Sequence, residues 1–245
     1  MNIKELLIIL IFSSVCFSQN QVCLDALSSQ VITKKFVLGK FDYKTHDLFV
    51  EVHPSHTSKI IYLNKEVYSA FLAMQDKAET DGINLKIISG TRNFNEQKWI
   101  WEKKWKKYSH LKPIDRAKKI LKYSSMPASS RHHWGTDIDL NSLKNSYFKS
   151  GQGKTEYKWL LEHASSFGFY QVYTKKINSE RTGYNLERWH WSYMPLASKY
   201  LSFYNKHIDY MDIMGFDGHE QAKALNIVKN YVNGISKTSK IASGL

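Results

Sequence analysis

The sequence of 245 residues predicts an α+β fold, because candidate strands and helices follow one another without regular alternation. Three observations support this class. Short apolar runs bounded by polar residues and glycines are typical of strands. Apolar residues at intervals of three and four predict amphipathic helices. The chain shows no internal repeat and no low-complexity tract, and its length suits one domain with extensions.

Residues 1–18 have the pattern of a secretory signal peptide. Lys4 supplies a positive start, residues 6–12 form an unbroken apolar run, and small serines follow. We expect cleavage after Ser18 and export of the protein. An uncleaved membrane anchor is the alternative, although the apolar run is short for a transmembrane span. Cys16 would leave with the signal and Cys23 would be a lone thiol, so no internal disulfide is expected.

Residues 19–62 are expected to form an N-terminal extension, with short strands at residues 36–38 and 48–52. Asn64 is a candidate N-cap for the helix that follows. Its apolar positions recur at helical spacing up to Asp81-Gly82, where the chain must turn. These positions are Val67, Phe71, Met74 and Ala78.

Leu85 to Ile88 is a short apolar run that predicts a buried strand. Asn93 or Asn95 can then cap a helix that carries tryptophans at 99, 101 and 105 together with Lys98, Lys103, Lys104, Lys106 and Lys107. Basic residues interleaved with tryptophan could hold a nucleic-acid strand. A solvated basic face with tryptophans packed inward is the more ordinary arrangement.

The rest of the chain continues the mixed pattern. We expect helices at 113–123, 157–167 and 196–204, and strands at 169–173 and 189–193, the last of them ended by Pro195. Residues 206–245 form a C-terminal extension with a helical stripe of Leu225, Val228, Val232 and Ile235. We expect this extension to be a structural cap, with partner binding as the alternative, and to fray after Lys237.

The formal net charge of +13 favours an anionic partner, and it survives removal of the signal peptide. Export argues against nucleic acid. Anionic polymers of a cell envelope fit the expected compartment better, and a merely soluble basic surface is the alternative.

Two stretches carry the candidate chemistry. Residues 130–139 gather two histidines and two aspartates around Gly135, which permits a sharp turn, and residues 187–191 add a glutamate and a histidine. A catalytic zinc ion takes imidazole and carboxylate ligands, keeps one position open for water, and needs a base beside it. The residue types therefore suit a zinc hydrolase.

The spacing of these residues resembles a known family. Ser130-x-His132-x-x-Gly135-x-x-x-Asp139, followed by Glu187-x-Trp189-His190, is similar to the zinc D-Ala-D-Ala carboxypeptidases and dipeptidases of the VanY and VanX type. These share a fold with lysostaphin-type endopeptidases and the hedgehog signalling domain. Ser89-Gly90-Thr91-Arg92, with Gln97 after it, resembles the family's Ser-Gly-Tyr-Arg segment.

The resemblance covers roughly residues 63–204, and we place the catalytic domain at 63–205. It implies a single metallopeptidase domain in which helices flank a small antiparallel sheet, with the C-terminal helical extension added. It also implies that one zinc ion is held by His132, Asp139 and His190, and that its bound water is the nucleophile. Glu187 would be the catalytic base.

The resemblance assigns further roles around the zinc ion. Arg92 would steady the substrate carbonyl as charge develops there. Ser130 and Gln97 would contact the substrate. We also expect Trp134 and Trp191 to wall the site and exclude water.

Two positions leave the ligand set open. The family usually carries alanine where this chain has Asp137, which could be a hydrogen-bond acceptor for a ligand histidine or could compete as a ligand. Likewise, His133 could replace His132. Because Asp137 and Asp139 are two residues apart, a strand would point both side chains toward the metal side.

The expected function is release of the terminal D-alanine from peptidoglycan stem peptides in the periplasm or cell envelope of a bacterium. Alternatives are an L,D-carboxypeptidase, an endopeptidase of the same family, or a non-catalytic zinc-containing module that binds cell wall. Glu187 favours an enzyme, because a binding module needs no base. We expect no nucleic-acid partner and no stable membrane insertion after signal cleavage, and the sequence indicates no oligomeric state.

Other hydrolase signatures fail. The zincin pattern breaks after His219-Glu220, and the Ser-x-x-Lys at 146–149 lacks the Lys-Thr-Gly companion of serine D,D-peptidases. The chain also lacks a phosphate-binding loop and a dinucleotide fingerprint.

Overall fold

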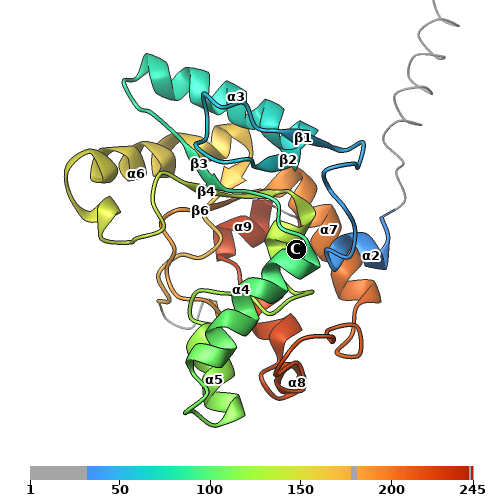
Figure 1. The fold of residues 1–245 in the computed structure, drawn as a ribbon. Coiled ribbons are helices and arrows are strands. Elements are labelled where there is room, and N and C mark those ends of the chain that lie inside the picture. The colour runs from blue at the N-terminus through green and yellow to red at the C-terminus, as the bar shows by residue number, and fades with distance from the viewer. Residues whose placement is uncertain (1–31, 178–180, 243, 245) are drawn as a thin grey trace, which may run out of the picture. The chain divides into compact units, whose positions relative to one another are not determined.

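The computed structural model describes residues 32–177, 181–242 and 244, of which those from Lys34 onward form one compact unit (Figure 1). The signal peptide predicted at residues 1–18 lies outside the described residues. A four-stranded antiparallel sheet has the order β3-β4-β6-β5, and two further strands form a separate pair. The strands are β1 (Phe49–Glu51), β2 (Tyr62–Asn64), β3 (Ile87–Ser89), β4 (Asp137–Leu140), β5 (Phe169–Tyr170) and β6 (His190–Tyr193).

Helices surround the four-stranded sheet, with α3 on one side and α4 and α5 on the other (Figure 1). The predicted α+β fold with a small antiparallel sheet flanked by helices is confirmed. The described helices are α2 (Lys34–Val37), α3 (Lys65–Thr80), α4 (Phe94–Lys107), α5 (Pro113–Ile120), α6 (Gly151–His163), α7 (Met194–His207), α8 (Gln221–Ala224) and α9 (Lys237–Ala242). Three short 3-10 helices, η1 (Arg131–Trp134), η2 (Tyr147–Lys149) and η3 (Ala164–Phe167), and a π-helical turn, η4 (Val228–Val232), complete this set.

The ends of α3 lie where the sequence predicts them. The Asn64 side chain accepts a hydrogen bond of 2.9 Å from the backbone N–H of Glu66, so it caps the first turn. The helix ends at Asp81, and Gly82 follows with a φ of +74° that suits glycine. These contacts fix the helix that covers the sheet.

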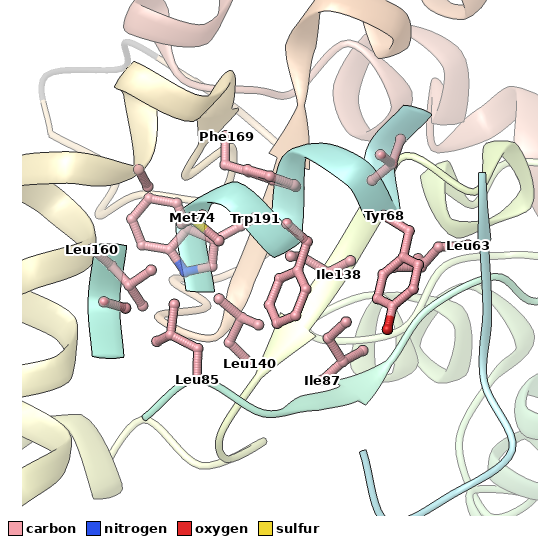
Figure 2. Packing of buried hydrophobic residues seen from close by; sticks show 14 of the residues in the cluster. Leu63, Tyr68, Met74, Leu85, Ile87, Ile138, Leu140, Leu160, Phe169 and Trp191 are labelled. Atoms are coloured by element: carbon pink, nitrogen blue, oxygen red, sulfur yellow. The ribbon is translucent and has the colours of Figure 1, made fainter. Parts of the chain in front are cut away.

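The hydrophobic core lies between α3 and the sheet. Figure 2 shows Tyr68 and Met74 of α3 beside Ile87 of β3, Ile138 of β4 and Trp191 of β6. All five side chains are buried. Burial of apolar area of this kind is the main favourable contribution to folding.

The four-stranded sheet has two chemically different faces, because side chains alternate along each strand. Ile138 of β4 and Trp191 of β6 belong to the core cluster, so they lie on what we call the apolar face. Their neighbours Asp137, Asp139 and His190 lie on the opposite, polar face, which α4 and α5 flank (Figure 1). The polar face carries the candidate chemistry.

Helix α4 begins with a capping box. Asn93 accepts from the backbone N–H of Glu96, and the Glu96 side chain accepts from the backbone N–H of Asn93. Trp101 and Trp105 are buried and stack with ring centroids 6.0 Å apart, whereas Trp99 is 65% exposed. The prediction of inward-packed tryptophans is therefore wrong for Trp99, which lies on the solvent side of the helix.

Several boundaries differ from the sequence-based expectation. Residues 36–38 are not a strand, because Phe36 and Val37 belong to the short helix α2 and Phe36 packs against Tyr200 of α7. Pro195 stands in the first turn of α7, where a missing N–H costs nothing. The strand predicted at 169–173 is limited to two residues of β5.

The C-terminal segment is not one continuous helix. Asn226 has a φ of +49°, which breaks the expected stripe between α8 and η4. The tail does not fray directly after Lys237, because α9 extends to Ala242. Leu225, Val232 and Ile235 are buried nonetheless.

None of the helices in the described ranges has the length and apolar character needed to cross a bilayer.

Candidate active site

Three potential metal ligands converge on the polar face. One donor atom each from His132, Asp139 and His190 lies within 4.8 Å of the other two, and all three residues are buried. Asp139 and His190 are direct partners across β4 and β6, and His132 lies on η1. Gly135 ends η1 with a φ of +69°, so it makes the turn that returns the chain toward Asp139. The structure therefore brings together the three ligands expected from the sequence.

The hydrogen bond of His132 to a backbone carbonyl leaves its other ring nitrogen available to bind a cation. His132 Nδ1 lies 2.8 Å from the Gly90 carbonyl oxygen, so it must donate its proton there. The unprotonated Nε2 then lies 3.5 Å from Asp139 Oδ2, and His190 Nδ1 lies 3.0 Å from Asp139 Oδ1. Burial lowers the pKa of His132 and thereby favours the neutral ring that metals require.

The electrostatics of Asp139 also suit a ligand. Burial alone would raise the pKa of Asp139, but its interactions with His132 and His190 hold it well below its usual range. Two imidazole nitrogens and one ionised carboxylate oxygen form a donor set typical of catalytic zinc. The residues present therefore fit this ion.

His133 does not belong to the donor group, because both of its ring nitrogens have other partners. Nδ1 lies 2.7 Å from the Arg92 carbonyl oxygen, and Nε2 accepts a hydrogen bond of 3.1 Å from the Ala128 N–H. Burial lowers the pKa of His133 to about 3, so the ring stays neutral. His133 connects two backbone segments beside the site, and of the two neighbouring histidines only His132 faces Asp139.

Asp137 lies on the far side of the His190 ring from Asp139. Its Oδ1 is 3.9 Å from His190 Nε2, and its Oδ2 is 3.3 Å from Arg131 Nε. Asp137 and Arg131 are both almost completely buried. Asp137 thus faces the His190 edge opposite Asp139 without a hydrogen bond, and it stands outside the group of three donor residues.

Glu187 lies on the loop that enters β6, as its spacing from His190 predicts. Its Oε2 is 3.9 Å from His190 Nδ1, and its backbone N–H donates to the Tyr173 carbonyl oxygen over 3.0 Å. Burial, followed by the charge of Asp139, raises the pKa of Glu187 well above its usual range. Arg92, Arg181 and Lys104 act in the opposite direction.

Arg92 is held by its neighbours. Its Nε donates to Gln97 Oε1 over 3.1 Å, and its Nη1 donates to Ser89 Oγ over 2.5 Å. The amide nitrogen of Gln97 in turn donates to the Ser125 carbonyl oxygen over 2.8 Å. Gln97 lines the cavity but uses both ends of its amide, so it positions Arg92. Ser130 is buried, lies outside the cavity lining, and its Oγ has no hydrogen-bond partner among the described residues.

A cavity of about 520 Å³ opens over these groups. Its walls include Tyr123, Tyr173 and Trp189. The expectation that Trp134 and Trp191 wall the site is wrong. Trp191 follows His190 on β6 and therefore belongs to the apolar face, and Trp134 donates its indole N–H to the Val37 carbonyl oxygen over 3.0 Å.

Several cavity residues carried no catalytic or ligand assignment from the sequence, among them Lys104, Asn145 and Tyr173. Helical spacing could have distinguished Lys104 from the other lysines of α4, because it lies seven residues after Gln97 and therefore on the same face of the helix. Tyr173, whose ring centroid lies 4.5 Å from that of His190, and Asn145 follow no motif that a single sequence displays.

The chain matches known proteins along most of this domain. The profile of the family described as "VanY: D-alanyl-D-alanine carboxypeptidase" matches residues 60–196. YodJ of Bacillus subtilis (strain 168), named as a carboxypeptidase, is 30% identical over 169 residues, which cover 67% of this chain and 59% of YodJ. A D-alanyl-D-alanine carboxypeptidase of Enterococcus faecalis (strain ATCC 700802 / V583) is 28% identical over 125 residues, or 50% of this chain and 45% of that protein. The chain therefore spans about half of the length of these relatives.

A solved structure supports the fold independently. The LdcB LD-carboxypeptidase superposes with a TM-score of 0.52 at 22% identity, covering 73% of this chain and 82% of that one. At this identity the likeness concerns the fold alone. The match over residues 60–196 includes every residue of the two metal-site motifs, and the chain belongs to the VanY family of D-alanyl-D-alanine carboxypeptidases.

Proposed function

We propose that this protein is a zinc-dependent carboxypeptidase that removes the terminal D-alanine from peptidoglycan stem peptides. One observation carries the proposal: three buried zinc-type ligands lie within 4.8 Å of one another, with the spare carboxylate of Glu187 beside them. Membership of a carboxypeptidase family supports the reaction type. We further propose export to the cell envelope, where such peptides occur.

His132, Asp139 and His190 would hold one zinc ion. When bound, the ion supplies a Lewis acid that activates water and polarises a carbonyl oxygen at neutral pH. Glu187 would accept the proton that the attacking water loses and deliver it to the leaving amine nitrogen. A spare carboxylate in this position favours an enzyme over a zinc-containing binding module.

Arg92 would stabilise the negative charge that develops on the scissile carbonyl oxygen. Its guanidinium lines the cavity and is fixed in advance by Gln97 and Ser89. A preorganised cation of this kind lowers the barrier because it needs no rearrangement as the charge forms. Asp137, paired with Arg131, would restrict the orientation of the His190 ring from the edge opposite Asp139.

The decisive experiment is digestion of isolated peptidoglycan with the purified protein, followed by mass spectrometry of the fragments. We expect pentapeptide stems to lose one alanine, a chelator to stop the reaction, and added zinc to restore it. Shortening of tetrapeptide stems would indicate L,D-carboxypeptidase activity instead, and opened cross-links would indicate an endopeptidase. Release of alanine that a chelator does not reduce would contradict the metal dependence.

A further inference from the structure

One lysine of α4 differs from the others. Gln97, Ile100 and Lys104 are spaced by three and four residues, so they lie on one side of the helix, and all three line the cavity. Lys104 is partly buried there, whereas Lys106 is exposed. Other lysines of this helix have partners outside the cavity, namely Lys98 with Glu102, Lys103 with Trp99 and Lys107 with Tyr108.

Lys104 forms no ion pair with any residue that the structure describes, although the charge of Glu187 acts on it from within the same cavity. Among the described residues no carboxylate oxygen lies within 4.0 Å of its ammonium group, which donates a hydrogen bond to Ser124 Oγ. Burial, followed by the charge of Arg92, lowers the pKa of Lys104. An ammonium group has three donors, and lysines withdrawn from water are usually paired. A partly buried cation that faces a cavity and is in direct contact with no carboxylate suits an anionic ligand.

Lys104 and Arg92 line the same cavity, so an anion bound to Lys104 would lie in the cavity that Arg92 also faces. Gln97 holds Arg92 and also donates to the Ser125 carbonyl oxygen, while Lys104 donates to the neighbouring Ser124. The segment 124–125 thus accepts hydrogen bonds both from Lys104 and from the residue that holds Arg92, and both cations line the same cavity. A carboxypeptidase substrate would offer one group to each cation, since its terminal carboxylate follows one residue after its scissile carbonyl.

We propose that Lys104 binds the C-terminal α-carboxylate of the peptide, while Arg92 stabilises the charge on the scissile carbonyl oxygen one residue before it. This inference rests on the proposed function and deepens it. The substrate class becomes peptides in which the residue after the scissile carbonyl carries a free carboxylate, and bonds without such a carboxylate would offer no anion to Lys104. The same contact sets the position of the scissile bond relative to Glu187.

The test compares two synthetic stem pentapeptides that differ only at the C-terminus, one a free acid and the other a carboxamide. We expect the zinc-loaded protein to prefer the free acid. In Lys104→Met, kcat/KM for the acid should fall about 10- to 100-fold, the usual range for a lost hydrogen bond to a charged group. The loss should fall mainly on KM, because the contact exists before and during the reaction. The amide should be cleaved as slowly as by the unaltered protein.

Lys106→Met is the matched control, since it removes a lysine from the exposed side of the same helix, and both rates should stay unchanged. Lys104→Arg should retain most of the preference. Thermal unfolding verifies that each variant is folded, and Lys104→Gln replaces the methionine variant if that one does not fold. Equal loss on both peptides would overturn the inference, as would equal cleavage of acid and amide by the unaltered protein. Cleavage of neither peptide by that protein would instead overturn the proposed function, and with it this inference.

Discussion

The two faces of β4 and β6 are built from alternate residues of the same strands, yet they meet opposite demands. Ile138 and Trp191 on the apolar face are enclosed by other apolar side chains. Asp139 and His190 on the polar face are equally buried but are surrounded by charges. Of two neighbouring positions in one strand, one therefore stabilises the fold and the other supplies a candidate metal ligand.

The buried groups of the polar face reduce the stability of the fold. Both carboxylate oxygens of Asp137, Nη1 of Arg131 and Nε2 of His190 have no hydrogen-bond partner among the described residues. Buried groups in this condition oppose folding, because they lose hydration without full compensation. The apolar face must supply the free energy that keeps such groups in place.

The largest expected effect concerns Glu187 and changes chemistry without stability. Glu187→Gln retains the shape of the side chain but cannot accept a proton, so kcat should fall about 10²- to 10⁴-fold. Zinc content, measured by atomic emission, and the melting temperature should stay close to those of the unaltered protein. Turnover within a few fold of that protein would refute the role of Glu187 as base.

Asp137 is the residue on the polar face that should affect both properties. Asp137→Ala leaves Arg131 buried and unpaired, which should reduce the free energy of unfolding by about 3–5 kcal/mol. The affinity for zinc should weaken about 10- to 100-fold, because His190 loses the carboxylate that faces its Nε2. Denaturant titration and calorimetry measure the two effects.

The double variant Arg131→Met with Asp137→Ala separates the effect on stability from the effect on zinc affinity. It should recover most of the stability, since no charge is left unpaired, but not the affinity for zinc. Recovery of both would show that Asp137 serves only to neutralise Arg131.

On the apolar face, Ile138→Ala should change stability without chemistry. Removal of a fully buried branched side chain should cost about 2–5 kcal/mol of unfolding free energy. Ile138→Val is the matched control and should cost about 0.5–1.5 kcal/mol. Below the melting temperature, both variants should bind one zinc ion per chain, and a changed stoichiometry would show that the two faces are coupled.

The smallest effect concerns the rim of the apolar face, where Asp81 accepts from Lys77 over 2.6 Å and from the Trp159 indole over 2.7 Å. The Lys77 hydrogen bond, then that of Trp159, lowers the pKa of Asp81 in the folded state. A lowered folded pKa stabilises the protein above the ordinary carboxyl pKa of about 4, and this contribution disappears as the pH falls through the folded value. Asp81→Asn should therefore melt slightly lower than the unaltered protein at neutral pH and equally at strongly acidic pH. A constant difference across that range would rule out the ionised form as the cause.

The sequence predicted those parts of the molecule that local patterns specify. The period of α3, its Asn64 cap and the spacing from His132 to Asp139 all appear as expected. Trp191 was assigned to the wrong face because a single sequence does not show on which side of the sheet the chemistry lies. Once His190 is placed, the alternation in β6 fixes Trp191 on the other side.

Contacts between distant segments could not be predicted in the same way. His133 competed with His132 until the carbonyl of Arg92 and the N–H of Ala128 showed that the His133 ring is fully engaged. The helix α2 was mistaken for a strand because the packing of Phe36 against Tyr200, far along the chain, overrides a weak local preference. The sequence does not single out Lys104, because the hydrogen bond that holds it in the cavity is made with Ser124 in a separate segment.

The donor set depends on how the strands are aligned. His132 is oriented by a carbonyl 42 residues away, at the end of β3, and Asp139 meets a histidine 51 residues away on β6. A slip of one residue between β4 and β6 would turn one of these two side chains away from the other. Newly made or misaligned chains would then lack the assembled donor set. In the proposed enzyme, peptide hydrolysis would therefore begin only after the sheet has formed, and neighbouring proteins would be spared until then.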